Sequence, residues 1–208
     1  MRAGAHFASA PRRVPRQERG ERRVAQLLEA AAAVIAATGY EAATMSAIAE
    51  RARAPIGSLY QFFPNKPAIT HALRTVYGGD YASLLKALKD EAAHLSVERL
   101  VIRLVGMTIA FVESHPAFLA LLDAPLSTRS PESLRQTLRL CLADCLAAVR
   151  PGLAKRKALR LAAVTLQMVK GLNQLYAEST AADRIHLVRE YRVAITCYLA
   201  TRLERVAA

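Results

Sequence analysis

Hydrophobic residues recur at intervals of three and four positions along most of the chain, which has 208 residues. That spacing places them on one face of an α-helix. The first such stripe consists of Val24, Leu27, Leu28, Ala31 and Ile35. No segment alternates apolar and polar residues in the manner of a half-buried strand. The pattern therefore predicts an all-α protein with about nine helices.

Capping residues and prolines divide the N-terminal region into short helices. Gly39 suits the end of the first helix, and Thr44 suits the N-cap of a second helix over about residues 45–53. Pro55 fits the first turn of a third helix, over about residues 55–63. Two short helices joined by a tight turn are typical of a helix-turn-helix.

The rest of the chain keeps the helical period, with breaks at Pro, Gly and Ser residues. We expect a bend at Gly78-Gly79. The pattern divides the chain into an arm over residues 1–20, a three-helix domain over 21–66 and a C-terminal helical bundle over 67–208. The later helices are expected at about residues 65–93, 96–114, 116–123, 130–151, 155–178 and 183–206.

Positive charge is concentrated at the N-terminus. The formal net charge is +12, and residues 1–23 contain seven Arg and two Glu. A strong positive field favours polyanions such as nucleic acid. A flexible basic arm beside a helix-turn-helix commonly touches phosphate groups, although a disordered tail that only increases solubility would have the same composition.

Several classes of protein are disfavoured. No apolar run reaches the roughly 18–20 residues of a membrane span, and residues 1–23 lack the apolar centre of a secretion signal. The odd set Cys141, Cys145 and Cys197 fits a reducing compartment better than a disulfide framework. The histidines are scattered, so we expect no metal and no cofactor. The lack of a membrane span and of a secretion signal predicts a cytoplasmic protein. Without a nucleophile motif or a glycine-rich phosphate loop, we expect that the protein is not an enzyme.

The segment from Thr44 to Lys66, TMSAIAERARAPIGSLYQFFPNK, carries the most specific signal. A helix-turn-helix inserts its second helix into the major groove and braces it with the first. An outward Ile56 is suited to a thymine methyl group and Gln61 to a base edge, whereas Leu59 and Phe63 should turn inward. The first residues of the inserted helix are small or exposed, as close approach to DNA requires: Pro55, Ile56, Gly57 and Ser58.

At these positions the chain closely resembles the tetracycline-repressor (TetR) family of transcriptional regulators, over about residues 22–75. Arg53 replaces a turn glycine, which costs about 1 kcal/mol if that position is left-handed. Pro55 replaces a capping serine, and Phe62 stands where His or Tyr is common. The residues that match at the family's spacings are Gly39, Tyr40, Thr44, Ile48, Ala49, Ala52, Gly57, Ser58, Leu59, Tyr60, Phe63 and Lys66.

The resemblance implies a role for each exposed residue of this segment. Thr44 and Ser46 would contact phosphate groups, although Thr44 is equally well explained as a helix cap. Tyr60 and Lys66 would anchor the DNA backbone, and the N-terminal residues of the inserted helix and Gln61 would lie nearest the bases. The expected DNA-binding residues are Thr44, Ser46, Pro55, Ile56, Gly57, Ser58, Tyr60, Gln61 and Lys66.

The resemblance also implies a C-terminal ligand-binding domain whose last two helices pair with their copies in a homodimer. Two-fold symmetry would require a near-palindromic site on double-stranded DNA. Apolar and adaptable residues of the middle helices, with a few polar ones, are candidates for the pocket, although Met and Phe at helical spacing are more often plain core. The candidates are Met107, Phe111, Phe118, Leu122, Gln167, Met168, Asn173 and Tyr176.

Together these features favour a ligand-responsive transcriptional regulator that a small-molecule inducer of unknown identity releases from DNA. Family habit favours a repressor. An activator, or a DNA-binding regulator without a small-molecule switch, stays open as the alternative. An enzyme that uses Cys141 or Cys145 with a distant histidine is the least supported hypothesis.

Overall fold

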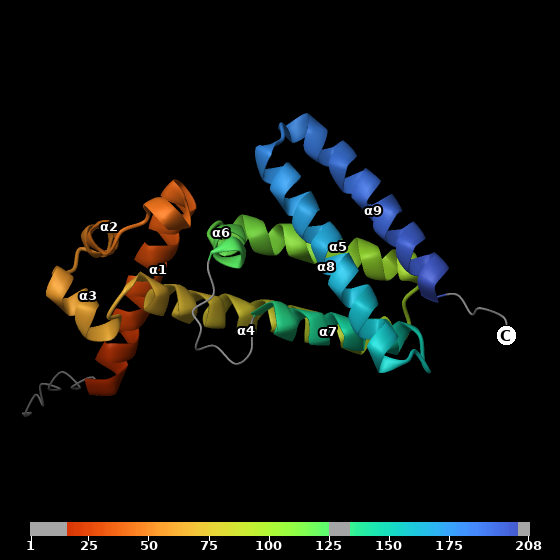
Figure 1. Cartoon of the computed structure of the whole chain (residues 1–208), viewed down its shortest axis with the longest axis horizontal. Helices are drawn as coiled ribbons and strands as arrows, with labels where there is room; N and C mark the ends of the chain where they lie inside the picture. Colours follow the sequence, from red (N-terminus) through yellow and green to blue (C-terminus); the bar gives the residue numbers. More distant parts are fainter. Residues whose placement is uncertain (1–15, 125–133, 204–208) are drawn as a thin grey trace, which may run out of the picture.

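The computed structural model describes residues 16–124 and 134–203, and all regular structure within these ranges is α-helical. The prediction of an all-α fold is confirmed. Figure 1 shows an N-terminal group of three helices, which the long helix α4 joins to a bundle formed by the later helices. The helices are α1 (Arg16–Ala42), α2 (Met45–Arg51), α3 (Ile56–Phe62), α4 (Lys66–Ala92), α5 (Val97–Ser114), α6 (Phe118–Asp123), α7 (Leu134–Val149), α8 (Lys155–Glu178) and α9 (Ala181–Leu203).

Two expectations about helix boundaries need correction. Helix α1 begins at Arg16, so residues 16–20, which the pattern assigned to the arm, are helical, whereas residues 1–15 lie outside the described ranges. Arg, Gln and Glu are good helix formers, so a helix needs no apolar residue in its first turn. Helix α4 continues through Gly78 and Gly79, and neither has a positive φ. Gly78 is buried, Gly79 is exposed, and both keep the helical conformation.

Buried side chains form two separate cores. The N-terminal core unites Leu27 and Ile35 of α1 with Ile48 of α2 and Leu59 of α3, all of them fully buried. Burying such a side chain contributes about 1.5–3 kcal/mol, so this core holds the short helices α2 and α3 in place. The C-terminal core is larger and draws on helices α4 to α9.

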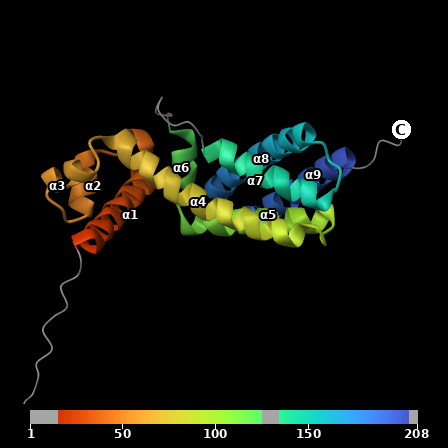
Figure 2. The same cartoon turned by 90° about the horizontal axis from the view of Figure 1, so that it is seen from below.

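Helices α4 and α6 contribute to both cores. Leu73 of α4 and Leu121 of α6 belong to the N-terminal core, whereas Tyr81 of α4 and Phe118 of α6 belong to the C-terminal core. Figure 2 shows α4 running from the N-terminal group along the bundle, with α6 beside it where the two parts meet. The two parts are therefore joined through packed side chains as well as through the chain itself.

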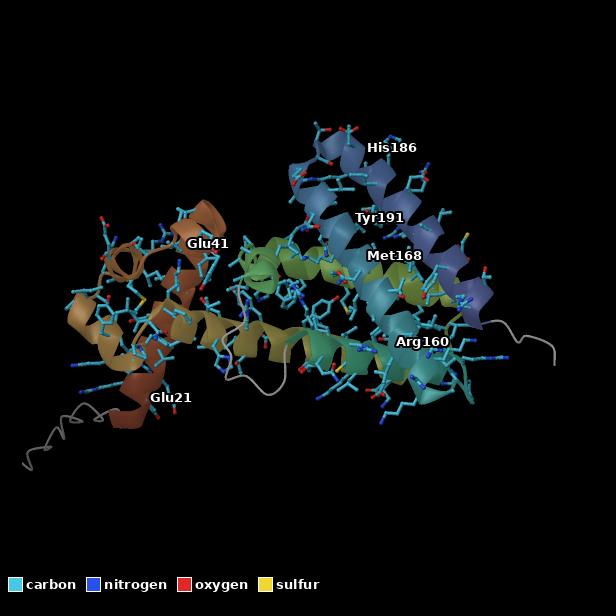
Figure 3. All side chains as sticks on the ribbon, viewed as in Figure 1. Glu21, Glu41, Arg160, Met168, His186 and Tyr191 are labelled. Carbon is cyan, nitrogen blue, oxygen red and sulfur yellow. The ribbon has the colours of Figure 1, made fainter. Side chains whose placement is uncertain are left out.

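Helices α8 and α9 form an antiparallel pair at the side of the bundle (Figure 1). Figure 3 shows His186 near the turn of this pair and Arg160 near its opposite end. Both helices expose large apolar side chains, among them Val164 and Leu175 of α8 and Ile185 and Val193 of α9. No helix within residues 16–124 and 134–203 is both long enough and apolar enough to span a membrane.

Candidate nucleic-acid interface and internal cavity

The turn between α2 and α3 has a defined backbone geometry. The amide of Ala54 donates to the carbonyl of Ala49 at 2.9 Å, and the amide of Arg53 donates to the carbonyl of Glu50 at 3.0 Å. These two hydrogen bonds form a Schellman motif, whose residue after the C-cap takes the left-handed conformation. Arg53 occupies that position with φ 49°. The turn therefore has the shape that glycine favours, although the residue is arginine.

Helix α3 has one buried face and one exposed face. Leu59 is 0% exposed and Phe63 follows in the N-terminal core, as the sequence predicts. On the other face Ile56 is 42% exposed and Tyr60 51% exposed, and Gln61 is exposed as well. Since apolar and aromatic side chains usually avoid water, this face is suited to contact with a partner.

Gly57 lies in the middle of the exposed face. A Cβ atom added at this position would meet no atom of the described residues within 4 Å, and its φ is not positive. Neither the backbone conformation nor the packing of this chain requires glycine here. The missing side chain leaves room for another molecule to approach the helix backbone, which is the approach that the major groove allows.

Polar groups gather at the start of α2 and α3. The Thr44 hydroxyl oxygen accepts from the amide of Ala47 at 3.1 Å, so Thr44 is the N-cap of α2, and Ser46 is exposed in the first turn. Pro55 is the N-cap of α3, one position before the first turn expected for it. Ser58 is partly exposed one turn further along. Thr44, Ser46, Pro55 and Ser58 thus stand at the N-terminal ends of the two short helices, where all but Ser58 are exposed.

Lys66 has a different environment from the one the sequence suggests. Its ammonium group donates to the carbonyls of Tyr40 and Glu41, at 2.9 and 3.0 Å, and lies 4.4 Å from the centre of the Tyr40 ring. These contacts tie the start of α4 to the end of α1. A lysine ammonium group has three N–H donors, so one donor is left for a phosphate group.

Two exposed arginines extend this surface beyond the residues that the sequence analysis selected. Arg51 ends α2 and Arg53 forms the turn, and both are exposed. They line a shallow depression together with Arg23 of α1. Their position in the turn of the helix-turn-helix is readable from the sequence, and positive charge there favours DNA phosphate groups.

An internal cavity of about 150 Å³ lies between α6, α7 and α8, with α4 and α5 at its floor. Tyr81 of α4 and Thr108 of α5 form the floor, with their side-chain oxygens 2.5 Å apart. Thr108 donates its own proton to the carbonyl of Leu104 at 2.7 Å, so Tyr81 is the donor to Thr108. Burial raises the pKa of Tyr81 to about 12, which keeps this hydroxyl neutral at any ordinary pH.

Four of the eight pocket candidates line this cavity, namely Phe118, Leu122, Gln167 and Asn173. The other four do not. Met107 and Phe111 face a shallow depression between α4 and α5, and Met168 packs as a half-buried side chain against the C-terminal core. Tyr176 lies near the turn between α8 and α9, where its hydroxyl donates to Glu113 at 2.8 Å. That hydrogen bond raises the pKa of Tyr176.

Three charged residues line the cavity that are not among the pocket candidates expected from the sequence. Arg135 and Arg139 of α7 and Lys170 of α8 line it, whereas none of its described lining residues is Asp or Glu. Arg135 and Arg139 stand four positions apart with Leu138 beside them, which places all three on one helix face. That spacing is visible in the sequence, but it does not reveal that the face borders a cavity.

Helix α6 separates the cavity from the N-terminal core. Phe118 and Leu122 line the cavity, whereas Leu121 packs into the N-terminal core. Arg74 of α4 fastens the end of α6, because its Nε–H donates to the carbonyl of Leu121 at 2.8 Å and its guanidinium also donates to Ala124. A shift of α6 would therefore reach both the N-terminal core and α4.

Metal-binding residues do not gather in the part of the chain that the structure describes: no three His, Cys, Asp or Glu side chains lie close enough together to hold an ion. Cys145 is buried and donates its thiol proton to the carbonyl of Leu85 at 3.2 Å, whereas Cys141 is half-buried and Cys197 is exposed. The structure gives none of the three cysteines a basic side chain as a hydrogen-bond partner.

Comparison with known proteins agrees with this architecture. The family model described as "Bacterial regulatory proteins, tetR family" matches residues 27–73, and "Tetracyclin repressor-like, C-terminal domain" matches residues 96–199. The HTH-type transcriptional repressor KstR of Mycolicibacterium smegmatis is 38% identical over 68 residues, which are 33% of this chain and 31% of that protein. KstR of Rhodococcus jostii is 33% identical over 85 residues, which are 41% of this chain and 39% of that protein. The matched segment thus spans about a third of these curated relatives.

Solved structures with the same fold cover nearly the whole chain. A TetR-family transcriptional regulator from Streptomyces coelicolor has a TM-score of 0.65 at 21% identity, covering 87% of this chain and 99% of that one. The regulator FadR from Bacillus subtilis, in complex with stearoyl-CoA, has a TM-score of 0.58 at 17% identity, covering 86% and 99%. At these identities the likeness establishes the fold alone.

A helix-turn-helix with an exposed recognition face, attached to an all-α bundle, defines a DNA-binding transcriptional regulator. The chain belongs to the tetR family of bacterial regulatory proteins.

Proposed function

We propose that this protein is a ligand-responsive repressor that binds a near-palindromic operator as a homodimer and is released by a small molecule. Two of the curated relatives that match part of this chain are named as repressors. In this proposal residues 21–66 form the unit that contacts DNA, and residues 67–208 bind the ligand and the second subunit. The proposed DNA contacts are Thr44, Ser46, Pro55, Ile56, Gly57, Ser58, Tyr60, Gln61 and Lys66.

The exposed face of α3 is the observation that carries the proposal. Packing within the described residues does not explain why Ile56 and Tyr60 are exposed. Gly57, which lies between them in the sequence, leaves the helix backbone open. A major groove about 12 Å wide admits such a helix. Gln61 then reads base edges, whereas Tyr60 donates its hydroxyl proton to a phosphate oxygen.

The second subunit would cover the outer face of α8 and α9. Ile185 is 66% exposed and Val193 54% exposed on α9, and Val164 and Leu175 are exposed on α8. Exposed apolar residues on two adjacent long helices are typical of an interface between subunits. The two-fold axis of such a dimer would place two copies of α3 on one face of the DNA.

Release would follow from a population shift. A ligand in the cavity that binds better when α6 has moved would favour that conformation, and α6 packs directly on the N-terminal core through Leu121. Arg74 would carry the same movement to α4. A coupling of about 1–3 kcal/mol corresponds to a 5- to 150-fold loss of DNA affinity.

Subunit association and DNA binding can be tested together with Val193→Glu. We expect this variant to be monomeric in sedimentation equilibrium and to lose affinity for a site selected from random duplexes, because a buried charge at the interface costs several kcal/mol. Val76→Glu is the matched control, because Val76 is an exposed valine of α4 outside the proposed subunit interface. A wild-type protein that binds its selected site as one subunit, or a selected site without two-fold symmetry, would contradict the proposal.

A further inference from the structure

A groove of about 800 Å³ runs between α5 and α9 on the surface of the bundle. Apolar side chains of both helices line it and are partly open to solvent: Ile102 of α5 is 37% exposed, and Ile185 and Val193 of α9 are 66% and 54% exposed. Exposed apolar side chains that share one groove favour contact with another molecule. Ile185 and Val193 also belong to the face that we expect the second subunit to cover, so the groove is continuous with the proposed interface.

One donor group in this groove lacks an acceptor. The Nε–H of Arg192 on α9 is shielded from solvent and has no hydrogen-bond acceptor among the residues that the structure describes. Glu98 of α5 lines the same groove but does not accept from this Nε–H. A buried donor without an acceptor is costly, and native proteins rarely keep one. A molecule that brings an acceptor into the groove would supply the missing hydrogen bond.

The charges of α8 and α9 restrict how two copies of the chain can pack together. These two helices contain nine Arg and Lys but three Asp and Glu. Two copies in contact through them would repel each other unless carboxylates of one copy face arginines of the other. Asp183 already accepts from the Thr180 hydroxyl at 2.6 Å. The exposed carboxylates Glu178 and Glu190 have no hydrogen bond or ion pair with a described residue, so both are available to a second copy.

From these observations we propose that the groove between α5 and α9 receives a second copy of this chain, and that Glu178 or Glu190 of that copy accepts the Nε–H of Arg192. Two-fold symmetry forms the contact twice, once in each groove. The charge pair then selects one register among those that the apolar side chains alone would allow. The inference rests on the proposed function, because it extends the proposed dimer interface from α8 and α9 to α5.

Arg192→Met tests the contact by sedimentation equilibrium of the full-length protein without DNA. Methionine keeps an apolar stem but has no N–H donor. Loss of one charge-assisted hydrogen bond weakens association about tenfold, so the two symmetric contacts should raise the Kd of the dimer about a hundredfold. Arg202→Met, which removes an exposed arginine of α9 outside the groove, is the control and should change the Kd about threefold or less. A Kd that Arg192→Met leaves unchanged would overturn the proposal.

Charge reversal identifies the acceptor. Arg192→Glu should weaken association more than Arg192→Met does, because it places like charges opposite each other. Combining it with the reversal of its partner, Glu178→Arg or Glu190→Arg, should restore the Kd to within about tenfold of the wild type. The carboxylate that is not the partner should give no recovery when it is reversed. Recovery cannot result from misfolding, since each single reversal weakens association. Failure of both combinations would reject the contact.

A small anion from solution is the alternative occupant of the groove. Thermal unfolding of the wild type and of Arg192→Met, with and without inorganic phosphate at constant ionic strength, tests it. If the second copy supplies the acceptor, phosphate should affect both proteins alike. Stabilisation of the wild type alone by phosphate, together with equal dimerisation of the two proteins, would assign the acceptor to an anion and overturn the proposal.

Comparison with Val193→Glu separates this inference from the proposed function. If Val193→Glu dissociates the dimer but Arg192→Met does not, the interface on the outer face of α8 and α9 stands and the contact in the groove fails. If Arg192→Met dissociates the dimer but Val193→Glu does not, the contact in the groove stands and the proposed position of the second subunit fails.

Discussion

Arg53 shows how a single residue can oppose its local geometry. Its φ of 49° is left-handed, and two backbone hydrogen bonds of the Schellman motif fix it there. The left-handed conformation costs an L-residue with a Cβ roughly 1–2 kcal/mol, whereas glycine avoids that cost but loses more freedom on folding. An arginine retained at this cost, in the turn of a helix-turn-helix, is consistent with a contribution to DNA affinity.

We therefore predict that Arg53→Gly raises the free energy of unfolding by about 0.5–1 kcal/mol and weakens DNA binding. Urea denaturation followed by circular dichroism measures the first effect, and fluorescence anisotropy on an operator duplex measures the second. Arg51→Gly is the control, because it places glycine at a helical position and should lower stability by about 1 kcal/mol. Equal stability changes for the two variants would contradict this account of the turn.

Cys145 allows a prediction about pH. Burial, followed by the nearby Cys141 and Asp144, raises the pKa of its thiol from 9.0 to about 12. The folded protein therefore keeps the thiol protonated while the unfolded chain ionises it above pH 9. This contribution to stability is complete below pH 9 and is lost as the pH rises from 9 to about 12.

At pH 8 the thiolate fraction of Cys145 should be about a thousandfold lower in the folded than in the unfolded protein. Thiol labelling should leave Cys145 unmodified until denaturant is added. In the folded state, Cys145→Ala should be labelled to the same extent as the wild type. After unfolding, the variant should show one labelled thiol fewer than the wild type. The same variant should lose less stability between pH 8 and pH 10.5. Rapid labelling of Cys145 in the folded protein would refute its assigned burial.

At the scale of the element, helix α3 serves two requirements at once. Leu59 and Phe63 attach it to the N-terminal core, and the opposite face stays open. Gly57 is the second residue of α3 and weakens the helix, because glycine loses more conformational freedom on folding than alanine does. Since no contact among the residues that the structure describes requires this glycine, the cost is best explained by the need for close approach to DNA.

Gly57→Ala should therefore stabilise the protein by about 0.5–1 kcal/mol and weaken operator binding at least about tenfold through a steric clash in the groove. Gly106→Ala in α5 is a matched control, since a Cβ there also meets no atom within 4 Å. It should give a similar stabilisation with unchanged DNA affinity. Thermal unfolding and anisotropy titration provide both quantities, and unchanged binding by Gly57→Ala would remove α3 from the proposed interface.

The sequence predicts the bounds of a helix where residues next to its ends interrupt the helical pattern. The range expected for α8, residues 155–178, matches the structure at both ends, because Pro151-Gly152 and Ser179 interrupt the helical pattern next to it. The N-cap Thr44 is confirmed for the same reason. The start of α1 was not predictable, because charged residues form helix and arm equally well.

The surroundings of individual residues depend on partners distant in the chain. Lys66 donates to carbonyls 25 and 26 residues away, a contact that no local pattern announces. Helical spacing marked Met107 and Phe118 alike as apolar, but it does not tell which helix each one faces. Only Phe118 borders the cavity. Periodicity thus predicts the faces of helices, and packing decides which of them meet.

At the scale of the whole molecule, α6 connects the cavity with the N-terminal core, and Arg74 connects it with α4. A bulky residue in the cavity should therefore imitate a bound ligand. Ala163 of α8 lines the cavity beside Leu166. We predict that Ala163→Phe displaces α6 and lowers operator affinity about tenfold, within the 5- to 150-fold range of a typical coupling. The control Ala87→Phe, at an exposed position of α4 outside the cavity, should change affinity little.

Arg74→Met tests whether the effect passes through the end of α6. The methionine keeps an apolar stem but cannot donate to the carbonyls of Leu121 and Ala124. In this background Ala163→Phe should lower operator affinity less than about threefold, a coupling of roughly 1 kcal/mol in the double-mutant cycle. Anisotropy titrations of the four proteins, with circular dichroism to verify folding, give the cycle. If Ala163→Phe weakens DNA binding equally with Arg74 and with Met at this position, the connection between cavity and DNA does not depend on this arginine.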